Sequence, residues 1–243
     1  NEGGGPGARC QGRAHCLGWG REDVRAMTSV LDRIRRQARL DPRRLVLAEG
    51  GDDRVVRAAE RLTRGTLARV TLIGDRETVR ATARRSEVSL VGVQVQDAAD
   101  PAEIARTAEA LRASRGDRLA AADRDRLAQD PLFQAAARVR EGLADCFVAG
   151  ASRTTADVLR AAIWLIGTAP GVSTVSSFFL MVLAPSAASS TERVFVFADC
   201  GVVPDPTPAQ LAEIGCLAAD RYEQLTGGVP HTYDNGYVLL DSS

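Results

Sequence analysis

The chain has 243 residues, with 31 basic and 31 acidic side chains, so its formal net charge is zero. This balance gives no overall attraction to nucleic acid or to an anionic membrane, and we expect neither as a partner. The longest apolar stretches, such as residues 176–184, are far shorter than the roughly 20 residues that span a bilayer.

The first 26 residues differ from the rest of the chain. They are rich in glycine and arginine and have neither a sustained hydrophobic period nor the apolar segment of a secretory signal. An amphipathic pattern begins directly after Met27. We interpret residues 1–26 as a leader that is not part of the native protein, with a disordered extension as the alternative.

Strand and helix patterns alternate through the next part of the chain. Short apolar runs that end at glycine indicate strands, and apolar residues at helical spacing indicate helices. The predicted helices are residues 30–40, 54–67, 77–85 and 101–114, and the predicted strands are residues 44–48, 69–73 and 91–95. This spacing is typical of βαβ units and predicts a largely parallel sheet, in a first α/β domain of residues 27–148.

The alternation continues less regularly beyond that domain boundary. The sequence predicts helical structure in residues 118–145, 155–166 and 208–225, and strands at residues 146–149, 175–183 and 193–198. We assign residues 149–226 to the start of a second α/β domain. The pattern fails after Thr226, so residues 227–243 are expected to form an aberrant tail with at most one strand.

The residue types exclude most familiar catalytic arrangements. All 31 basic residues are arginine, so a Schiff-base lysine, a phosphate-loop lysine and a lysine general base are absent. The two histidines, His15 and His231, lie outside the segments that we expect to fold, so no histidine triad or metal site is predicted. An anion site must therefore use arginine, hydroxyls and backbone N–H groups, and arginine binds phosphate bidentately.

The five cysteines form no CxxC pair and no metal-ligand spacing. Cys146 and Cys200 lie in apolar runs, which favours buried, reduced thiols over reactive ones. This usage is typical of a reducing compartment, and we expect the protein in the cytoplasm.

Residues 49–54, EGGDDR, follow a predicted strand and open a predicted helix. Ligands of open α/β sheets bind beyond the carboxyl ends of strands, and a helix N-terminus favours anions. The carboxylates of Asp52 and Asp53 instead favour an ordinary capped turn. Both interpretations remain open from these residues alone.

Residues 150–160, GASRTTADVLR, form a second candidate, with a glycine at a strand end and hydroxyls at a helix start. Ser152, Thr154 and Thr155 can donate to phosphate beside free backbone N–H groups, and Arg160 can lean back towards the helix N-terminus. The alternative is an N-cap cluster with a surface arginine.

Residues 111–116, LRASRG, form a third candidate, a helix end that carries Arg112 and Arg115. Arginine at a helix C-terminus is usually a partner of the helix dipole, which is the alternative to an anion-binding role.

Taken together, these segments resemble the phosphate acetyltransferase family. The most specific stretch begins at Thr168 and continues to Glu213. It reads TAPGVSTVSSFFLMVL and then VFVFADCGVVPDPTPAQLAE, followed by Ile214, which are similar to the family's TAPGV-VSS-FLM and FADC-V-P-PT-ELAEI runs. The three candidates above are similar to its PEG-x-D-x-R, GA-x-H-TTAD-x-LRPA and LR-xxx-G motifs. The likeness covers about residues 30–227. Three positions depart from it: Arg153 replaces the motif histidine, and Ala48 and Ala161 replace prolines.

The resemblance implies two α/β domains with an isocitrate/isopropylmalate-dehydrogenase-like architecture, mostly parallel sheets and a cleft between them, the second domain being incomplete here. It implies reversible acetyl transfer between coenzyme A and inorganic phosphate, with acetyl-CoA and acetyl phosphate as the other substrates and no permanently bound cofactor or metal. Phosphate groups are expected to contact Arg54, Arg112 and Arg160, with Ser152, Thr154 and Thr155 beside them. A homodimer is compatible with the family.

The STKGS loop and the later SRG element, which come after the helix of residues 208–225 in the family, are not found after that helix here, so catalytic residues are not assigned and we expect little turnover from this chain. A non-catalytic module that binds anions or coenzyme A, a phosphate butyryltransferase-like acyltransferase and a poorly folding product remain as alternatives. A nicotinamide-dependent dehydrogenase is disfavoured, because no GxGxxG follows the first strand.

Overall fold

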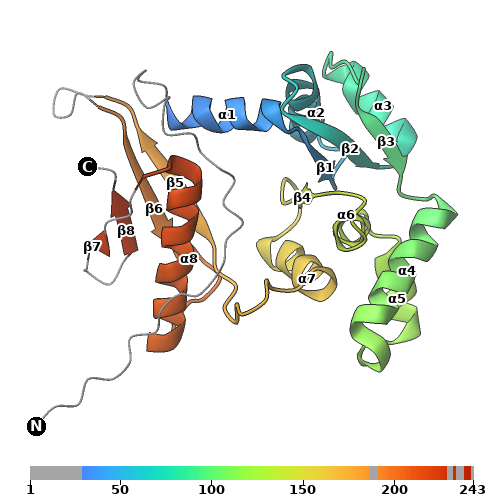
Figure 1. The fold of residues 1–243 in the computed structure, drawn as a ribbon. Coiled ribbons are helices and arrows are strands. Elements are labelled where there is room, and N and C mark those ends of the chain that lie inside the picture. The colour runs from blue at the N-terminus through green and yellow to red at the C-terminus, as the bar shows by residue number, and fades with distance from the viewer. Residues whose placement is uncertain (1–28, 186–190, 229–231, 234–237, 242–243) are drawn as a thin grey trace, which may run out of the picture. The chain divides into compact units, whose positions relative to one another are not determined.

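The computed structural model describes residues 29–185, 191–228, 232–233 and 238–241 (Figure 1). By their contacts these residues form two compact units. We call residues 35–169 the parallel-sheet unit, and residues 29–34 with the described residues from 170 onward the antiparallel-sheet unit. The expected leader, residues 1–26, lies outside the described residues.

The parallel-sheet unit has a four-stranded sheet in the order β3-β2-β1-β4, in which every neighbouring pair is parallel. Its strands are β1 (Arg43–Leu47), β2 (Ala68–Gly74), β3 (Gln94–Asp97) and β4 (Cys146–Val148). The helices are α2 (Asp53–Arg64), α3 (Arg76–Arg85), α4 (Pro101–Arg115), α5 (Ala121–Ala128), α6 (Pro131–Arg140) and α7 (Thr155–Leu165), with a 3-10 turn at Gly116–Arg118. Helix α1 (Val30–Leu40) contributes residues to both units.

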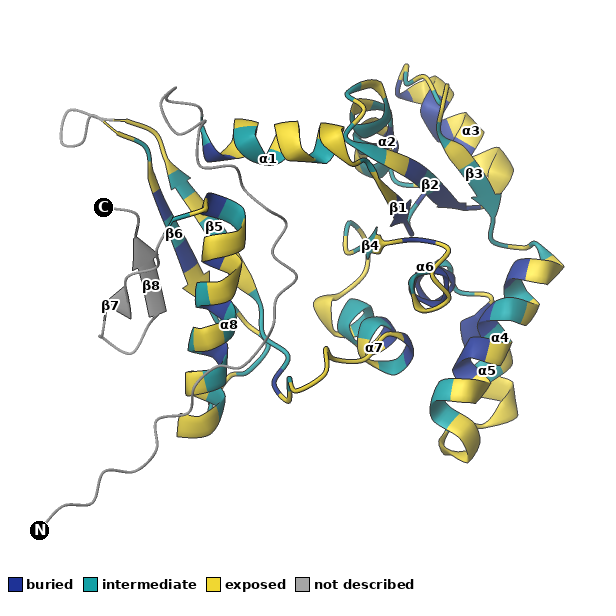
Figure 2. Ribbon diagram, in the orientation of Figure 1, coloured by how far each residue is buried: buried dark blue, intermediate teal, exposed yellow. Residues whose placement is uncertain are grey.

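The last three residues of β1, Leu45–Leu47, are buried on both faces of the sheet, which explains their continuous apolar run (Figure 2). Leu45 and Leu47 belong to a core that also contains residues of α2 and α3. Val46, between them, belongs to a second core that contains residues of α4, α6 and α7. The sheet is therefore covered by helices on both faces, as the βαβ spacing predicts.

Two predicted elements in this unit differ from the observed ones. The third strand occupies Gln94–Asp97 rather than residues 91–95. The helical segment predicted over residues 118–145 is divided, because Asp130 caps a new helix whose first residue is Pro131. Proline suits a first helical position, since its missing N–H would have no helical partner there.

The boundary between the compact units also differs from the predicted domain boundary at residues 148 and 149. Helix α7 packs against α6 and α4, and Leu165 is fully buried in their common core. The parallel-sheet unit consequently continues to Ala169.

The antiparallel-sheet unit contains β5 (Phe178–Leu183), β6 (Arg193–Ala198), β7 (Thr232–Tyr233) and β8 (Val238–Asp241), with α8 (Pro208–Thr226). The strand order is β5-β6-β8-β7, and every pairing is antiparallel. The expectation of mostly parallel sheets is therefore wrong for this unit. Residues 184–192 connect β5 to β6 and are too few for the helical crossover that parallel neighbours need.

Part of the segment expected to be an aberrant tail belongs to this sheet. Val238–Asp241 pairs with β6, and Thr232–Tyr233 pairs with β8. The rest of residues 229–243 lies outside the described residues. The core of the unit is formed by Val194 and Val196 of β6 with Ala218 and Tyr222 of α8, and includes Val30.

The prediction of buried thiols is wrong for both cysteines that it named. Cys146 is exposed and Cys200 is half-buried. Cys146 lies on β4, which is the end strand of its sheet and is only three residues long, so its apolar sequence does not bring full burial.

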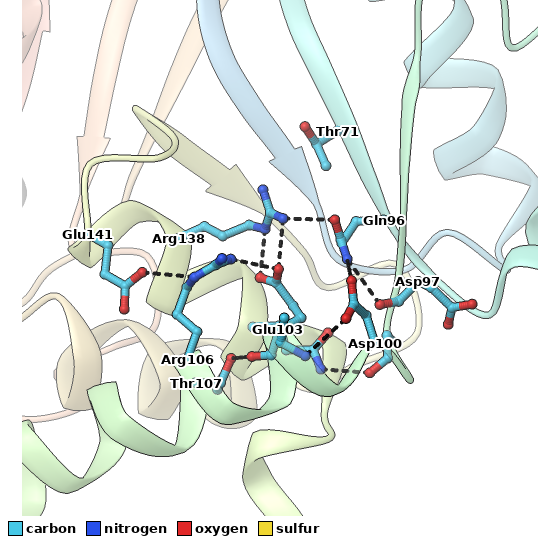
Figure 3. A network of polar contacts seen from close by, with 12 residues as sticks. Thr71, Gln96, Asp97, Asp100, Glu103, Arg106, Thr107, Arg138 and Glu141 are labelled. Atoms are coloured by element: carbon cyan, nitrogen blue, oxygen red, sulfur yellow. Dashed lines mark hydrogen bonds and ion pairs between the residues drawn. The ribbon is translucent and has the colours of Figure 1, made fainter.

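A polar network joins β3, α4 and α6 within the parallel-sheet unit (Figure 3). Arg138 of α6 donates from Nε and Nη2 to the two carboxylate oxygens of Glu103, both at 2.8 Å, and from Nη2 to Gln96 at 3.0 Å. Arg106 donates to the same Glu103 carboxylate at 2.7 Å and pairs with Glu141 at 3.4 Å. The network therefore helps to hold α6 in position. Its position matters below, because Asp130 and Pro131 at the start of α6 line the candidate site.

Candidate functional site

The first two candidate segments meet where the chain order of the sheet reverses. From β1 the chain proceeds to β2 and β3 on one side, whereas β4 lies on the other side of β1. Leu47 is in register with Val148, and the N–H of Ala48 donates to the carbonyl of Val148 at 3.3 Å. The residues after β1 and β4 are therefore neighbours at a topological switch point, the usual ligand position in open α/β sheets.

The carboxylate of Glu49 occupies a concave arrangement of backbone N–H groups that follows β4. Its Oε2 accepts from the N–H groups of Gly150 and Ala151, both at 2.8 Å. Its Oε1 accepts from the N–H groups of Ser152 at 2.7 Å and Arg153 at 2.9 Å, and from the Ser152 hydroxyl at 2.8 Å. We call these four consecutive N–H groups the 150–153 nest. Gly150 has φ +105°, a backbone conformation that favours glycine.

These hydrogen bonds determine the protonation state of Glu49. Partial burial of the carboxyl favours its neutral form and raises the pKa, but donation from the N–H groups of Ser152, Ala151 and Gly150 and from the Ser152 hydroxyl lowers it by more. The net pKa is below the ordinary value for glutamate. The nest therefore holds an ionised carboxylate at neutral pH.

Arg54 contacts the same loop from the other candidate segment. Its guanidinium donates to Asp52 at 3.0 and 2.7 Å and to the backbone carbonyl of Ala151. The Arg54 guanidinium lowers the pKa of the Asp52 carboxyl, and Asp52 also caps α2. The capped-turn interpretation of residues 49–54 is thus correct for Asp52, while Glu49 and Arg54 bind the neighbouring loop.

The three hydroxyl residues predicted for this site have different positions. Ser152 donates through both its N–H and its hydroxyl to Glu49, so those donors are occupied in this conformation. Thr154 is the N-cap of α7, accepting from the N–H of Asp157 at 3.2 Å and donating to its carboxylate at 2.8 Å. Thr155 is exposed at the first position of α7.

Two hollows of the parallel-sheet unit share the ion pair between Arg153 and Asp130. Arg153 Nη2 lies 2.7 Å from both carboxylate oxygens of Asp130, which caps α6. The smaller hollow, about 230 Å³, is lined by Glu49, Gly50 and Ser152 among others. We name it the Glu49 hollow.

The larger hollow, about 300 Å³, is lined by residues of α5, α6 and α7. We name it the arginine hollow. Arg126, Arg153 and Arg160 line it together with the rings of Phe133 and Trp164. Each of these arginines pairs with an aspartate that also lines the hollow: Asp123 at 3.2 Å, Asp130 at 2.7 Å and Asp157 at 3.2 Å, respectively. Formal charges therefore balance, while the guanidinium groups remain partly exposed.

The predicted arginines are not all in one place. Arg160 lines the arginine hollow, and Arg54 bonds to the loop that borders the Glu49 hollow. Arg112 pairs with Glu109 at 2.8 and 2.9 Å on the exposed side of α4 and lines neither hollow. The structure thus shows Arg112 in a surface ion pair with Glu109.

Sequence reasoning missed Glu49, Asp130 and Arg126 as members of this site. Glu49 is within a motif that the sequence identified, but its partners are more than 100 residues away. Asp130 precedes a proline, a pattern that signals a helix start and gives no sign of its pairing with Arg153.

Within the ranges given above, no group of three or more histidine, cysteine, aspartate or glutamate side chains has a geometry that would hold a metal ion. Among the same residues, no helix has the length and apolar character needed to cross a bilayer.

Comparison with known proteins gives consistent matches. The sequence profile of a family described as phosphate acetyl/butaryl transferase matches residues 29–232. The chain is 38% identical over 218 residues to a phosphate acetyltransferase of Acetivibrio thermocellus, covering 88% of this chain and 64% of the relative. It is 42% identical over 200 residues to the enzyme of that name from Paracoccus denitrificans, covering 82% and 59%.

The fold has solved counterparts as well. A phosphotransacetylase from Streptococcus pyogenes matches with a TM-score of 0.72 and 30% identity, over 81% of this chain and 58% of that one. The chain thus spans between 58% and 64% of the length of these three proteins.

Proposed function

The chain belongs to the phosphate acetyl/butaryl transferase family, and on that premise we propose that its function is reversible acetyl transfer between coenzyme A and inorganic phosphate. In this reaction the coenzyme A thiolate attacks the carbonyl carbon of acetyl phosphate. A carbon–sulfur bond forms, the bond from that carbon to the phosphate oxygen breaks, and inorganic phosphate leaves with the electron pair. The thiol proton goes to a base that we do not assign. The substrates are small molecules, and the proposal requires no permanently bound cofactor.

The arginine hollow is the observation that best supports this proposal. Arg126 and Arg160 are held by carboxylates in exposed i,i+3 pairs, and such pairs contribute only about 0–1 kcal/mol. A substrate phosphate offers a bidentate, charge-assisted partner and can therefore replace those carboxylates. Trp164, which is partly buried and lines the hollow, supplies apolar surface beside these charges. We propose this hollow as a phosphate-binding region for the substrates.

Charge stabilisation by arginine suits the chemistry of the reaction. The transition state places negative charge on the acyl oxygen and on the departing phosphate, and fixed cationic donors stabilise such charge. Our proposal retains Arg54 and Arg160 as substrate-contacting residues. Arg112 is retained as a third position, to be tested separately because of its place on α4. We propose that the protein acts in the cytoplasm and as a homodimer.

A coupled pair of measurements tests the proposal. Acetyl-CoA formation from acetyl phosphate and coenzyme A is measured for the purified chain, and coenzyme A binding is measured by calorimetry. Because little turnover is expected from this chain, the variant is compared by binding: we expect Arg160→Gln to raise the Kd for coenzyme A about tenfold or more, in line with the loss of a charge-assisted hydrogen bond. Arg80→Gln is the matched control, because Arg80 pairs with Glu77 on the exposed surface of α3.

The outcomes separate the candidate functions. Absence of turnover with retained coenzyme A binding would favour the non-catalytic binding module. Faster turnover with butyryl phosphate than with acetyl phosphate would favour the butyryl enzyme. If neither turnover nor binding is detected, the proposal is wrong for this chain.

A further inference from the structure

We propose that Glu49 is a positioning residue whose carboxylate is the permanent occupant of the 150–153 nest. Four consecutive N–H groups that point to one centre form an arrangement that binds anions in general. The carboxylate supplies that anion from within the chain. Substrate phosphate then binds to arginine side chains around the nest rather than to the nest itself. The inference rests on the proposed function only in this last step.

The first argument is the completeness of the carboxylate's hydrogen bonding. Both oxygens of Glu49 accept, and all five donors lie within 2.7 to 2.9 Å. An incoming phosphate would have to displace these five bonds and remain beside the displaced negative charge. The loss of these hydrogen bonds and the repulsion between phosphate and the displaced carboxylate both oppose displacement. Glu49 is therefore favoured as the permanent occupant of the nest.

The second argument is that the backbone around Glu49 is held in place on both sides. The N–H of Ala48 donates to the carbonyl of Val148 at 3.3 Å, and the N–H of Gly50 donates to the carbonyl of Ile73 at 3.0 Å. The carboxylate therefore extends from a backbone that is fixed by β4 and β2. Movement of Glu49 away from the nest requires a rotation of its side chain or the loss of these contacts.

The third argument concerns what the nest controls. Arg153 donates its N–H to Glu49 and its guanidinium to Asp130, so its backbone is fixed by one contact and its side chain by the other. Arg153 lines both hollows. Arg153 directly precedes Thr154 in the chain, and Thr154 is the N-cap of α7, the helix that carries Arg160. Glu49 thereby sets the position of Arg153, which lines the proposed phosphate-binding region, and of Arg160, which we propose to contact the substrate.

Removal of the carboxylate provides the test, because the vacated nest opens into the Glu49 hollow, which has room for a small anion. The purified chain and its Glu49→Ala variant are compared by amide hydrogen exchange of residues 150–153, with and without millimolar formate. We expect exchange in the variant to be about tenfold faster or more, and formate to restore protection. Formate is expected to have no effect on these amides in the unmodified chain. Glu77→Ala, at an exposed surface pair, is the matched control.

A second variant covers the case in which Glu49→Ala does not fold. Glu49→Gln retains the shape and one acceptor oxygen but places an NH₂ group against N–H donors. We expect it to lose protection at two of the four amides, whereas Glu77→Gln is expected to lose none. Equal exchange in Glu49→Gln and the unmodified chain would overturn the inference.

Inorganic phosphate tests the alternative role of the nest as a substrate site. If phosphate moves the side-chain carboxyl resonance of Glu49 in the unmodified chain to the position of an exposed glutamate, the nest exchanges Glu49 for substrate and the inference is wrong. If formate fails to restore protection in Glu49→Ala, the nest is not an anion site and the inference is also wrong. These measurements do not depend on turnover, so loss of acetyl transfer in the unmodified chain contradicts the proposed function and leaves the position of Glu49 intact.

Discussion

Replacement of Arg138 by methionine is expected to destabilise the parallel-sheet unit strongly. The Arg138 side chain is 10% exposed and that of Glu103 is 2% exposed, so the change leaves a buried carboxylate without its main partner. Breaking one side of a buried ion pair typically costs about 3–5 kcal/mol. Arg106 still donates to Glu103 at 2.7 Å, which compensates in part, and we expect about 3 kcal/mol. Methionine preserves much of the apolar stem, so lost packing contributes little.

Urea denaturation followed by tryptophan fluorescence measures this effect, because Trp164 belongs to the same unit. Glu109→Ala breaks an exposed pair with Arg112 and is the control, with an expected change within about 0.5 kcal/mol. The double variant Glu103→Leu with Arg138→Met removes both buried charges. It is expected to recover most of the lost stability, since apolar replacements of buried pairs are often neutral.

Two results would refute this reasoning. A loss below about 1 kcal/mol for Arg138→Met would mean that the pair is not buried in the way that its exposure indicates. A double variant as unstable as the single one would mean that packing, and not an uncompensated charge, dominates the cost.

Three further predictions concern local features of the two units. Gly50→Ala places a Cβ 2.9 Å from the carbonyl oxygen of Ile73, a backbone atom that cannot move aside cheaply, and we expect a loss of about 1–3 kcal/mol in urea denaturation; an unchanged midpoint would contradict the contact. Thr207→Ala removes a capping box with Gln210 and is expected to cost about 1 kcal/mol, measured as a lower urea midpoint of the antiparallel-sheet unit. The hydroxyls of Thr174 and Ser173 and the N–H of Ser173 lower the pKa of Glu213 to about 2. The contribution of this carboxylate to stability is therefore complete above the unfolded pKa near 4.5 and is lost as the pH falls towards 2. A carboxyl NMR titration of Glu213 with a midpoint near 4.5 would show that these hydrogen bonds are absent in solution.

The predicted site and the observed site overlap in their segments and differ in how the side chains are used. Residues 49–54 and 150–160 do meet at one edge of the sheet, as expected for segments that follow neighbouring parallel strands. The N–H donors expected for phosphate are occupied by Glu49 instead. Local sequence identifies a group of donors, but it does not identify the acceptor that reaches them from another part of the chain.

What the sequence determined by itself was local. The apolar run of β1, the caps at Asp100 and Thr207 with proline after each, and the glycine after β4 define where elements begin and end. These signals act over a few residues, because they depend on backbone conformation and on the nearest hydrogen bonds.

The tertiary structure decided the pairings between distant segments. It joined β5 to β6 in an antiparallel pair, left Cys146 exposed on an end strand, and placed Glu49 in a nest formed 101 to 104 residues later. None of these features is encoded by hydrophobic period or by capping residues, since each depends on which segment becomes a neighbour after folding. The chemistry of the candidate site follows from those long-range contacts.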